Sequence, residues 1–165
     1  MVSVFDTSKE SFDFEDLVEI MRILRSPEGC PWDREQSLAT LKDYCLEEAG
    51  EVCSAIDKVL ETGDPAAWGE LCEELGDLLL QVVFQAQLAS EENKFAISDV
   101  VGAICTKLIR RHPHVFGGTV AETSGEVLAN WRIIKAAERE AKAEGMTISA
   151  KDAEKLVTGN GPAQN

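Results

Sequence analysis

The sequence is poor in histidine, in aromatic residues and in basic residues. Its 165 residues include two His and one Tyr, and aromatic residues make up 6% of the chain. No uninterrupted apolar run approaches the roughly 18 residues of a membrane span, so we expect no membrane association. The 16 Lys and Arg residues against 30 Asp and Glu give a formal net charge of −14. Because a phosphate backbone repels such a chain, we also expect no general nucleic-acid binding.

The sequence also lacks a cysteine pattern that would indicate disulfide bonds. The five Cys are an odd number without a C-x-x-C motif, and most of them lie in segments of helical character. The first residues lack the basic-then-apolar layout of a secretion signal. These features predict reduced, packed thiols and a cytoplasmic protein.

What the sequence does contain is helical periodicity. Apolar residues recur at helical spacing and alternating apolar and polar runs are scarce, which predicts an all-α protein, a bundle of about five helices. We predict one domain over residues 12–144, with flexible tails at residues 1–11 and 145–165. The first predicted helix is Phe14–Leu24, and the second runs to about Leu60 from an N-cap at Asp33, which forms a capping box with Gln36. The third runs from Asp64-Pro65 to about Ala89, the fourth from an N-cap at Ser98 to Arg111, and the fifth begins near Ser124.

Carboxylates interrupt the apolar faces of the second and third predicted helices. At about 100° per residue, Glu48 of LEEAGEV lies in the middle of the apolar arc, and Glu51 lies one turn further. In EELGDLLLQVV, Glu74 and Asp77 repeat this i, i+3 spacing. A short Gly-Asp-Pro turn makes the two helices antiparallel neighbours, so we expect the two acidic pairs to face a shared interior.

Four carboxylates facing one another would repel unless a cation lies between them. Either motif alone also fits the solvated face of an acidic helix, but two together in apolar arcs favour a metal site. Oxygen-only ligands suit Mg²⁺, with Mn²⁺ as a possible substitute. The Glu-x-x-His pattern of di-iron bundles is missing.

Basic and aromatic residues further along the chain are candidates for contacts with an anionic substrate. Lys107 and Arg111 share a helix face at i, i+4, as do Trp131 and Lys135. A phosphate clamp is one interpretation, and charge that complements the C-terminal end of a helix is the other. Trp32, in CPWDREQ, fits either a core position or a stacking surface for a base.

Five motifs in order carry a family resemblance: CPWDREQ, LEEAGEV, EELGDLLLQVVFQAQ, KLIRRHPHVFG and SGEVLANWRIIK. Together they closely resemble the MazG nucleotide pyrophosphohydrolases, over about residues 17–142. The resemblance implies the all-α NTP pyrophosphatase fold. It also implies Mg²⁺-dependent hydrolysis of NTPs or dNTPs to monophosphate and pyrophosphate, as nucleotide-pool house-cleaning.

The resemblance also implies residue roles. Glu47 would hold a second metal or orient the attacking water. Some family members carry two tandem domains and this chain carries one, so we expect a homodimer or homotetramer. Gly50 departs from the family pattern at a cost of about 0.5–1 kcal/mol relative to Ala. The implied metal ligands are Glu48, Glu51, Glu74 and Asp77, and the implied nucleotide contacts are Lys107, Arg111, Trp131 and Lys135.

Two other functions remain open at this stage. One is a non-catalytic helical oligomer that binds metal or nucleotide as a sensor or scaffold. The other is a phosphatase that removes only the terminal phosphate. Because bundles host many functions, turnover and the identity of the product separate these possibilities, and fold does not.

Overall fold

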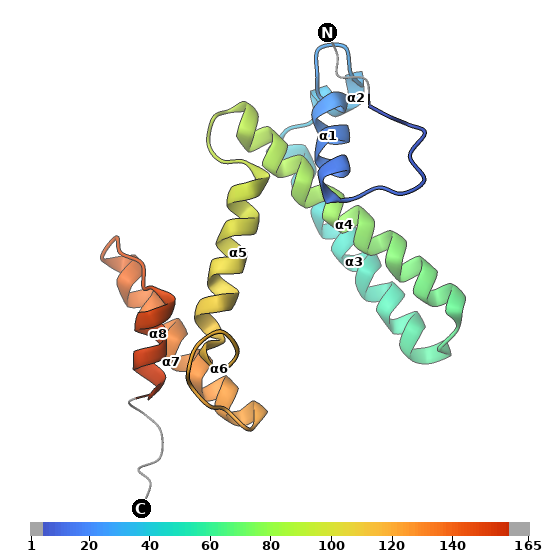
Figure 1. Ribbon diagram of the computed structural model, residues 1–165. Helices are drawn as coiled ribbons and strands as arrows, with labels where there is room; N and C mark the ends of the chain where they lie inside the picture. The colour runs from blue at the N-terminus through green and yellow to red at the C-terminus, as the bar shows by residue number, and fades with distance from the viewer. Residues whose placement is uncertain (1–4, 159–165) are drawn as a thin grey trace, which may run out of the picture. The chain divides into compact units, whose positions relative to one another are not determined.

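The computed structural model describes residues 5–158, and over that range the chain is helical without strands (Figure 1). The all-α prediction is therefore confirmed. The chain divides into two compact units, residues 1–100 and 101–165, and the boundary falls within α5. The helices are α1 (Phe14–Leu24), α2 (Pro31–Glu35), α3 (Leu38–Thr62), α4 (Pro65–Glu91), α5 (Ile97–Arg111), α6 (Pro113–Phe116), α7 (Ser124–Ala143) and α8 (Ala150–Thr158).

The first unit is built on the α3–α4 hairpin (Figure 1). Gly63 ends α3 in the left-handed region at φ 62°, which glycine adopts without the steric cost of a Cβ. Asp64 then caps α4 by accepting a hydrogen bond from the Ala66 amide at 2.8 Å, and Pro65 occupies the first helical position. The predicted start of this helix is confirmed.

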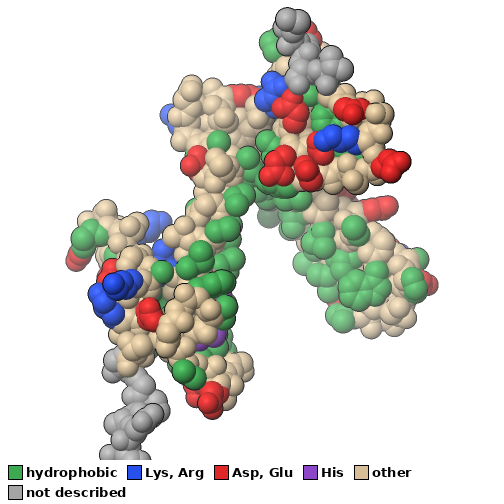
Figure 2. Space-filling view, viewed as in Figure 1, with side chains coloured by type: hydrophobic (Ala, Val, Ile, Leu, Met, Phe, Trp, Pro, Cys, Tyr) green, Lys and Arg blue, Asp and Glu red, His purple; other side chains and the backbone are tan. Residues whose placement is uncertain are grey.

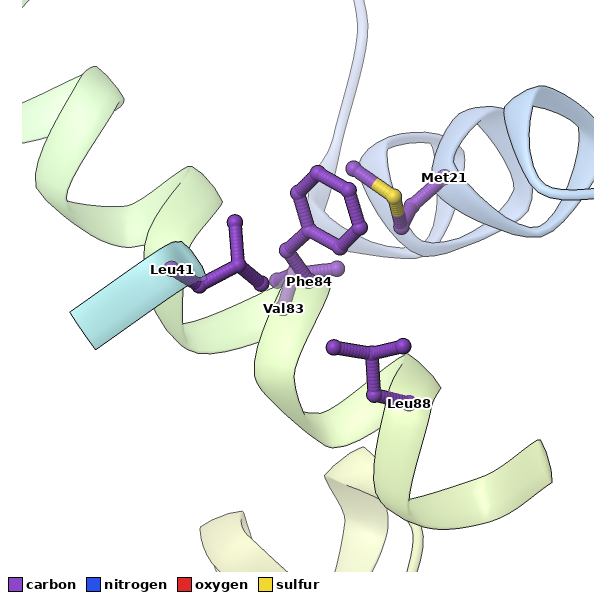
Figure 3. Packing of buried hydrophobic residues seen from close by; sticks show 5 residues of the cluster. All are labelled: Met21, Leu41, Val83, Phe84 and Leu88. Carbon is purple, nitrogen blue, oxygen red and sulfur yellow. The ribbon is translucent and has the colours of Figure 1, made fainter. Parts of the chain in front are cut away.

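Helix α1 packs on the C-terminal half of α4 and closes the core of this unit. Its predicted bounds are confirmed, and a reciprocal capping box between Asp13 and Asp16 fixes its start. Arg25, at its end, binds Glu91 of α4 through two hydrogen bonds of 2.6 and 2.8 Å. The core cluster is Met21, Leu41, Val83, Phe84 and Leu88 (Figure 3).

The predicted start of the second helix is wrong. Gln36 has an extended backbone, ψ 144°, which separates the short helix α2 from α3. Ser37 caps α3 in a box with Thr40, whereas Asp33 lies inside α2. Two capping signals occur four residues apart, and the second one, Ser37, starts the long helix.

The chain beyond α4 holds more structure than the sequence predicts. Helix α5 begins at Ile97, ahead of the predicted Ser98 cap, and the Asp99 side chain accepts from the Ala96 amide at 2.8 Å. The predicted break at HPHVFGG contains the single turn α6.

The flexible tail predicted from residue 145 is wrong over α8, while residues 159–165 lie outside the described range. Ala153 and Val157 of α8 pack with Ile134 of α7, which is fully buried. This core depends on contact between two helices, so the small apolar content of α8 alone does not predict it. The tail predicted at residues 1–11 has no helix where it is described, from residue 5 on.

Within the described residues, none of the helices combines the length and the apolar character needed to cross a membrane.

Candidate functional site

The α3–α4 hairpin brings three carboxylates together. Glu48 of α3 and Glu74 and Asp77 of α4 each present an oxygen, and these oxygens lie within 4.8 Å of one another. The antiparallel hairpin sets this register, because Glu48 and Asp77 lie at similar distances in sequence from the turn at Gly63. On α3, the apolar residues around the Glu48 face are buried as the helical wheel predicts: Leu41, Val52, Ala55 and Val59.

Burial and the crowding of like charge raise the pKa of two of these carboxyls. Burial, followed by the negative charges of Asp77 and Glu51, raises the pKa of Glu48. Burial, followed by Glu51 and Asp77, raises the pKa of Glu74. Both carboxyls are half-buried, and either a proton or a bound cation would relieve the repulsion between them.

Glu51 lies outside the set of three converging carboxylates. Its side chain is exposed, yet it is near enough to raise the pKa of both Glu48 and Glu74. Glu47 is exposed, and its negative charge contributes least to the raised pKa of Glu48. Both residues therefore act on the cluster electrostatically without belonging to the set of three.

The donor set suits a hard divalent cation. Three carboxylates converge without a thiolate or imidazole among them, which is the ligand chemistry of Mg²⁺, Mn²⁺ or Ca²⁺. Mg²⁺ bound by a few carboxylates usually completes its coordination with water. The residues present thus fit such an ion.

The second unit contains the predicted cationic residues. Lys107 is exposed, with no ion pair to any residue in the described part of the chain. Arg111 instead binds Glu138 of α7, as does Arg110, each through an ion pair of 2.6 Å. Although burial opposes it, hydrogen bonds from Arg111 and Arg110 hold the pKa of Glu138 below its ordinary value. Glu138 therefore stays ionised near neutral pH.

The predicted aromatic contacts have different surroundings. Trp131 of α7 is half-buried, and His112 lies edge-on to it at 5.1 Å between ring centroids. Its indole N–H has no acceptor in the described structure. Lys135 is exposed one turn further along α7.

The core alternative for Trp32 is wrong. Its side chain is 52% exposed and lies edge-on to Tyr44, 6.1 Å between centroids. A stacking role for the exposed ring stays a prediction.

Two features of the structure have no recognisable motif in the sequence. Glu138 belongs to none of the sequence motifs, although its i+7 spacing from Trp131 places it on the same face of α7. Gln81, one turn beyond Asp77 on α4, is buried, and its Oε1 has no hydrogen-bond partner in the described structure. A polar residue in an apolar helix was the available signal for Gln81.

Comparison with known proteins now identifies the family. Residues 36–116 match the MazG nucleotide pyrophosphohydrolase domain. The nucleoside triphosphate pyrophosphohydrolase of Escherichia coli K12 is 52% identical over 129 residues, which cover 78% of this chain and 46% of that protein. The chain contains a MazG nucleotide pyrophosphohydrolase domain.

Further relatives are similar to this chain over a comparable length. The Thermotoga maritima nucleoside triphosphate pyrophosphohydrolase/pyrophosphatase MazG is 51% identical over 126 residues, covering 76% of this chain and 45% of that protein. The uncharacterized protein YabN of Bacillus subtilis is 45% identical over 127 residues, covering 77% of this chain and 24% of that protein. This MazG chain thus spans about half the length, or less, of these curated relatives.

The matched MazG domain contains all the acidic candidates and part of the basic ones. Glu48, Glu74 and Asp77 lie inside residues 36–116, as do Lys107 and Arg111. Trp32, Trp131 and Lys135 lie outside the matched range.

Proposed function

We propose that this chain hydrolyses nucleoside triphosphates, in ribose or deoxyribose form, to the monophosphate and pyrophosphate. The observation that carries the proposal is the convergence of Glu48, Glu74 and Asp77 within 4.8 Å on the α3–α4 hairpin. Relatives about half identical to the chain are named nucleoside triphosphate pyrophosphohydrolases, which supports the same reaction class. The proposed role is the removal of unwanted nucleotides from the pool.

The proposed cofactor is Mg²⁺, with Mn²⁺ as a substitute. Glu48, Glu74 and Asp77 would hold the ion, and Glu51 would add a fourth carboxylate. When bound, the ion supplies charge neutralisation for the phosphates and lowers the pKa of a water. Glu47, exposed beside the cluster, would orient the attacking water.

The proposed substrate contacts come from the second unit. Lys107, Arg111 and Lys135 would offset the negative charge of the phosphates, and the Trp131 indole would offer its unpaired N–H and its apolar face. Exposed Trp32 is a second candidate for stacking on the base.

Exposed apolar side chains support the proposed homodimer or homotetramer. Hydrophobic side chains gather over the α3–α4 hairpin (Figure 2). Leu60 is 78% exposed and Trp68 58%, and Leu75 and Leu79 are also exposed in the single chain. Association of hairpins would bury this surface. Light scattering coupled to size-exclusion chromatography measures the mass, and a monomer at micromolar concentration would contradict this part of the proposal.

The proposed location is the cytoplasm. The five cysteines form no disulfide with one another, which fits a reducing compartment.

Product analysis tests the proposed reaction. The chain is incubated with a panel of NTPs and dNTPs, with Mg²⁺ or with EDTA, and the products are separated by ion exchange. We expect monophosphate and pyrophosphate only with metal. Release of orthophosphate alone would indicate a terminal phosphatase, and nucleotide binding without turnover would indicate a sensor or scaffold.

Substitution at the cluster tests the metal ligands. Glu48→Gln keeps the size of the side chain and removes a negatively charged ligand, so we expect turnover to be lost while the helical circular dichroism spectrum is retained. Asp57→Asn is the matched control, because nine residues along α3 place it on the opposite face. Full activity of Glu48→Gln would contradict the ligand assignment.

A further inference from the structure

A cavity in the second unit concentrates positive charge in an otherwise acidic protein. Nine of the 16 Lys and Arg residues follow Val100, but only seven of the 30 acidic residues do. The cavity has a volume of about 430 Å³, within the range of small-molecule sites. It is lined by Lys107, Arg110, Arg111, Glu138, Arg139, Lys142 and the segment Met146–Ile148.

Glu138 positions two of these cations without neutralising the cavity. Arg110 and Arg111 each direct Nε and Nη2 to the Glu138 carboxylate, so one negative charge is shared by two guanidinium groups. The Nη1 groups of both have no hydrogen-bond partner in the described part of the chain. The side chains of all three residues are between 15% and 22% exposed, so the geometry is held in a partly desolvated position.

The remaining cations of the cavity have no carboxylate of their own. Lys107, Arg139 and Lys142 form no ion pair with any residue that the structure describes. Five cations and one carboxylate therefore line the cavity. Attraction to the C-terminal ends of α5 and α7 stabilises single cations, but it does not explain why the cations of two helices face one cavity.

The C-terminal segment supplies an apolar wall. Ile148 packs against the core formed by Ile134, Ala153 and Val157, so α8 fixes this wall in place. Met146 lies beside it with a 55% exposed side chain. A ligand in this cavity would therefore meet guanidinium and ammonium groups on one side and an apolar surface on the other.

We infer that this cavity binds a ligand carrying two or more linked phosphate groups, and that Arg139 and Lys142 form part of its phosphate contacts. Guanidinium groups with free N–H donors bind phosphate oxygens, and linked phosphates match several separate cations. The inference deepens the proposed function and rests on it for the source of the ligand. That source is either the polyphosphate chain of a nucleotide or the pyrophosphate product.

Calorimetric titration of the full chain in EDTA tests the site without turnover. The probes are inorganic pyrophosphate, tripolyphosphate and ATP, with AMP as a monophosphate comparison. We expect saturable binding of the linked phosphates, weaker at high salt, and much weaker binding of AMP. Arg139→Gln combined with Lys142→Gln should weaken it about tenfold, the loss expected for two exposed charge pairs.

A matched double variant controls for net charge. Arg132→Gln combined with Lys151→Gln removes the same two charge types from exposed positions of α7 and α8 outside the cavity. We expect this variant to bind as the parent chain does. Equal weakening by both double variants, or no saturable binding by the parent chain, would overturn the inference.

A single substitution separates the two sources of the ligand. Met146→Ala should weaken ATP binding but not pyrophosphate binding if the apolar wall contacts a nucleoside, and should affect neither if the product is the ligand. Failure of this site is distinguishable from failure of the proposed function. A chain that hydrolyses nucleotides but binds neither pyrophosphate nor tripolyphosphate saturably in EDTA loses only the inference, and a chain that binds pyrophosphate without turnover loses only the function.

Discussion

Replacing Glu48 by glutamine should stabilise the metal-free protein. The raised pKa of Glu48 means that the folded state disfavours the ionised carboxylate, through burial and through Asp77 and Glu51. The unfavourable contribution is fully present above the folded pKa and disappears as the pH falls through it. A neutral amide of the same size removes the contribution at pH 7.

The distance between the oxygens sets the magnitude. The ligand oxygens of the cluster lie no more than 4.8 Å apart, and at that upper limit two carboxylates repel by about 1 kcal/mol in water and by about 3 kcal/mol at an effective dielectric constant near 20. Because Asp77 is exposed, we expect the lower value. For a chain of this length, about 1 kcal/mol raises the melting temperature by about 2–4 °C.

Magnesium should reverse the order of stability. A ligand at 100 times its dissociation constant stabilises the native state by about 2.7 kcal/mol. The parent chain should gain this amount, whereas Glu48→Gln, with one ligand fewer, should gain much less. Without metal the variant melts higher, and with metal the parent chain does.

Thermal unfolding followed by circular dichroism measures both effects, in EDTA and across a Mg²⁺ series at pH 7. Asp57→Asn removes a charge from the opposite face of α3 and should respond to Mg²⁺ as the parent chain does. A Glu48→Gln variant that melts lower in EDTA, or that gains as much from Mg²⁺ as the parent chain, would refute the reasoning.

Three other substitutions have expected outcomes that equilibrium unfolding can measure. Hydrogen bonds from Arg25 lower the pKa of Glu91, so the pair stabilises the fold at pH values above the pKa that Glu91 has in the unfolded chain. This stabilisation is lost as the pH falls through the pKa of Glu91 in the folded protein. Glu91→Gln should therefore cost about 1 kcal/mol of unfolding free energy at pH 7, and an equal loss of stability at pH 3 would contradict this cause. Gly50→Ala should stabilise α3 by about 0.5–1 kcal/mol, because an added Cβ meets no neighbouring atom; a loss would indicate that another chain covers this face. Ile134→Ala should destabilise the α7–α8 packing by about 2–5 kcal/mol, and a negligible change would show that α8 is not held there.

Local features of this protein could be predicted because local interactions determine them. The start of α4 follows from Asp64 and Pro65, whose cap and backbone angle act within one helical turn. The position of Glu48 in an apolar arc follows from helical periodicity alone. Where two local signals compete, as at Asp33 and Ser37, the sequence does not show which one starts the longer helix.

The candidate site could be predicted only in part. The four acids were recognisable from their spacing, but the convergence of Glu48, Glu74 and Asp77, with Glu51 outside, depends on the register of two packed helices. The anchoring of Arg111 by Glu138 joins residues 27 positions apart, and no local pattern links them.

Sequence by itself determined the helical class, the turn between α3 and α4, and which helix face carries the acids, because hydrogen bonding and periodicity operate over a few residues. Tertiary structure decided which carboxylates meet, that α8 packs on Ile134, and that cations from α5 and α7 line one cavity with Glu138. Such arrangements arise when helices distant along the chain pack together, and the contacts between their side chains exist only after that packing.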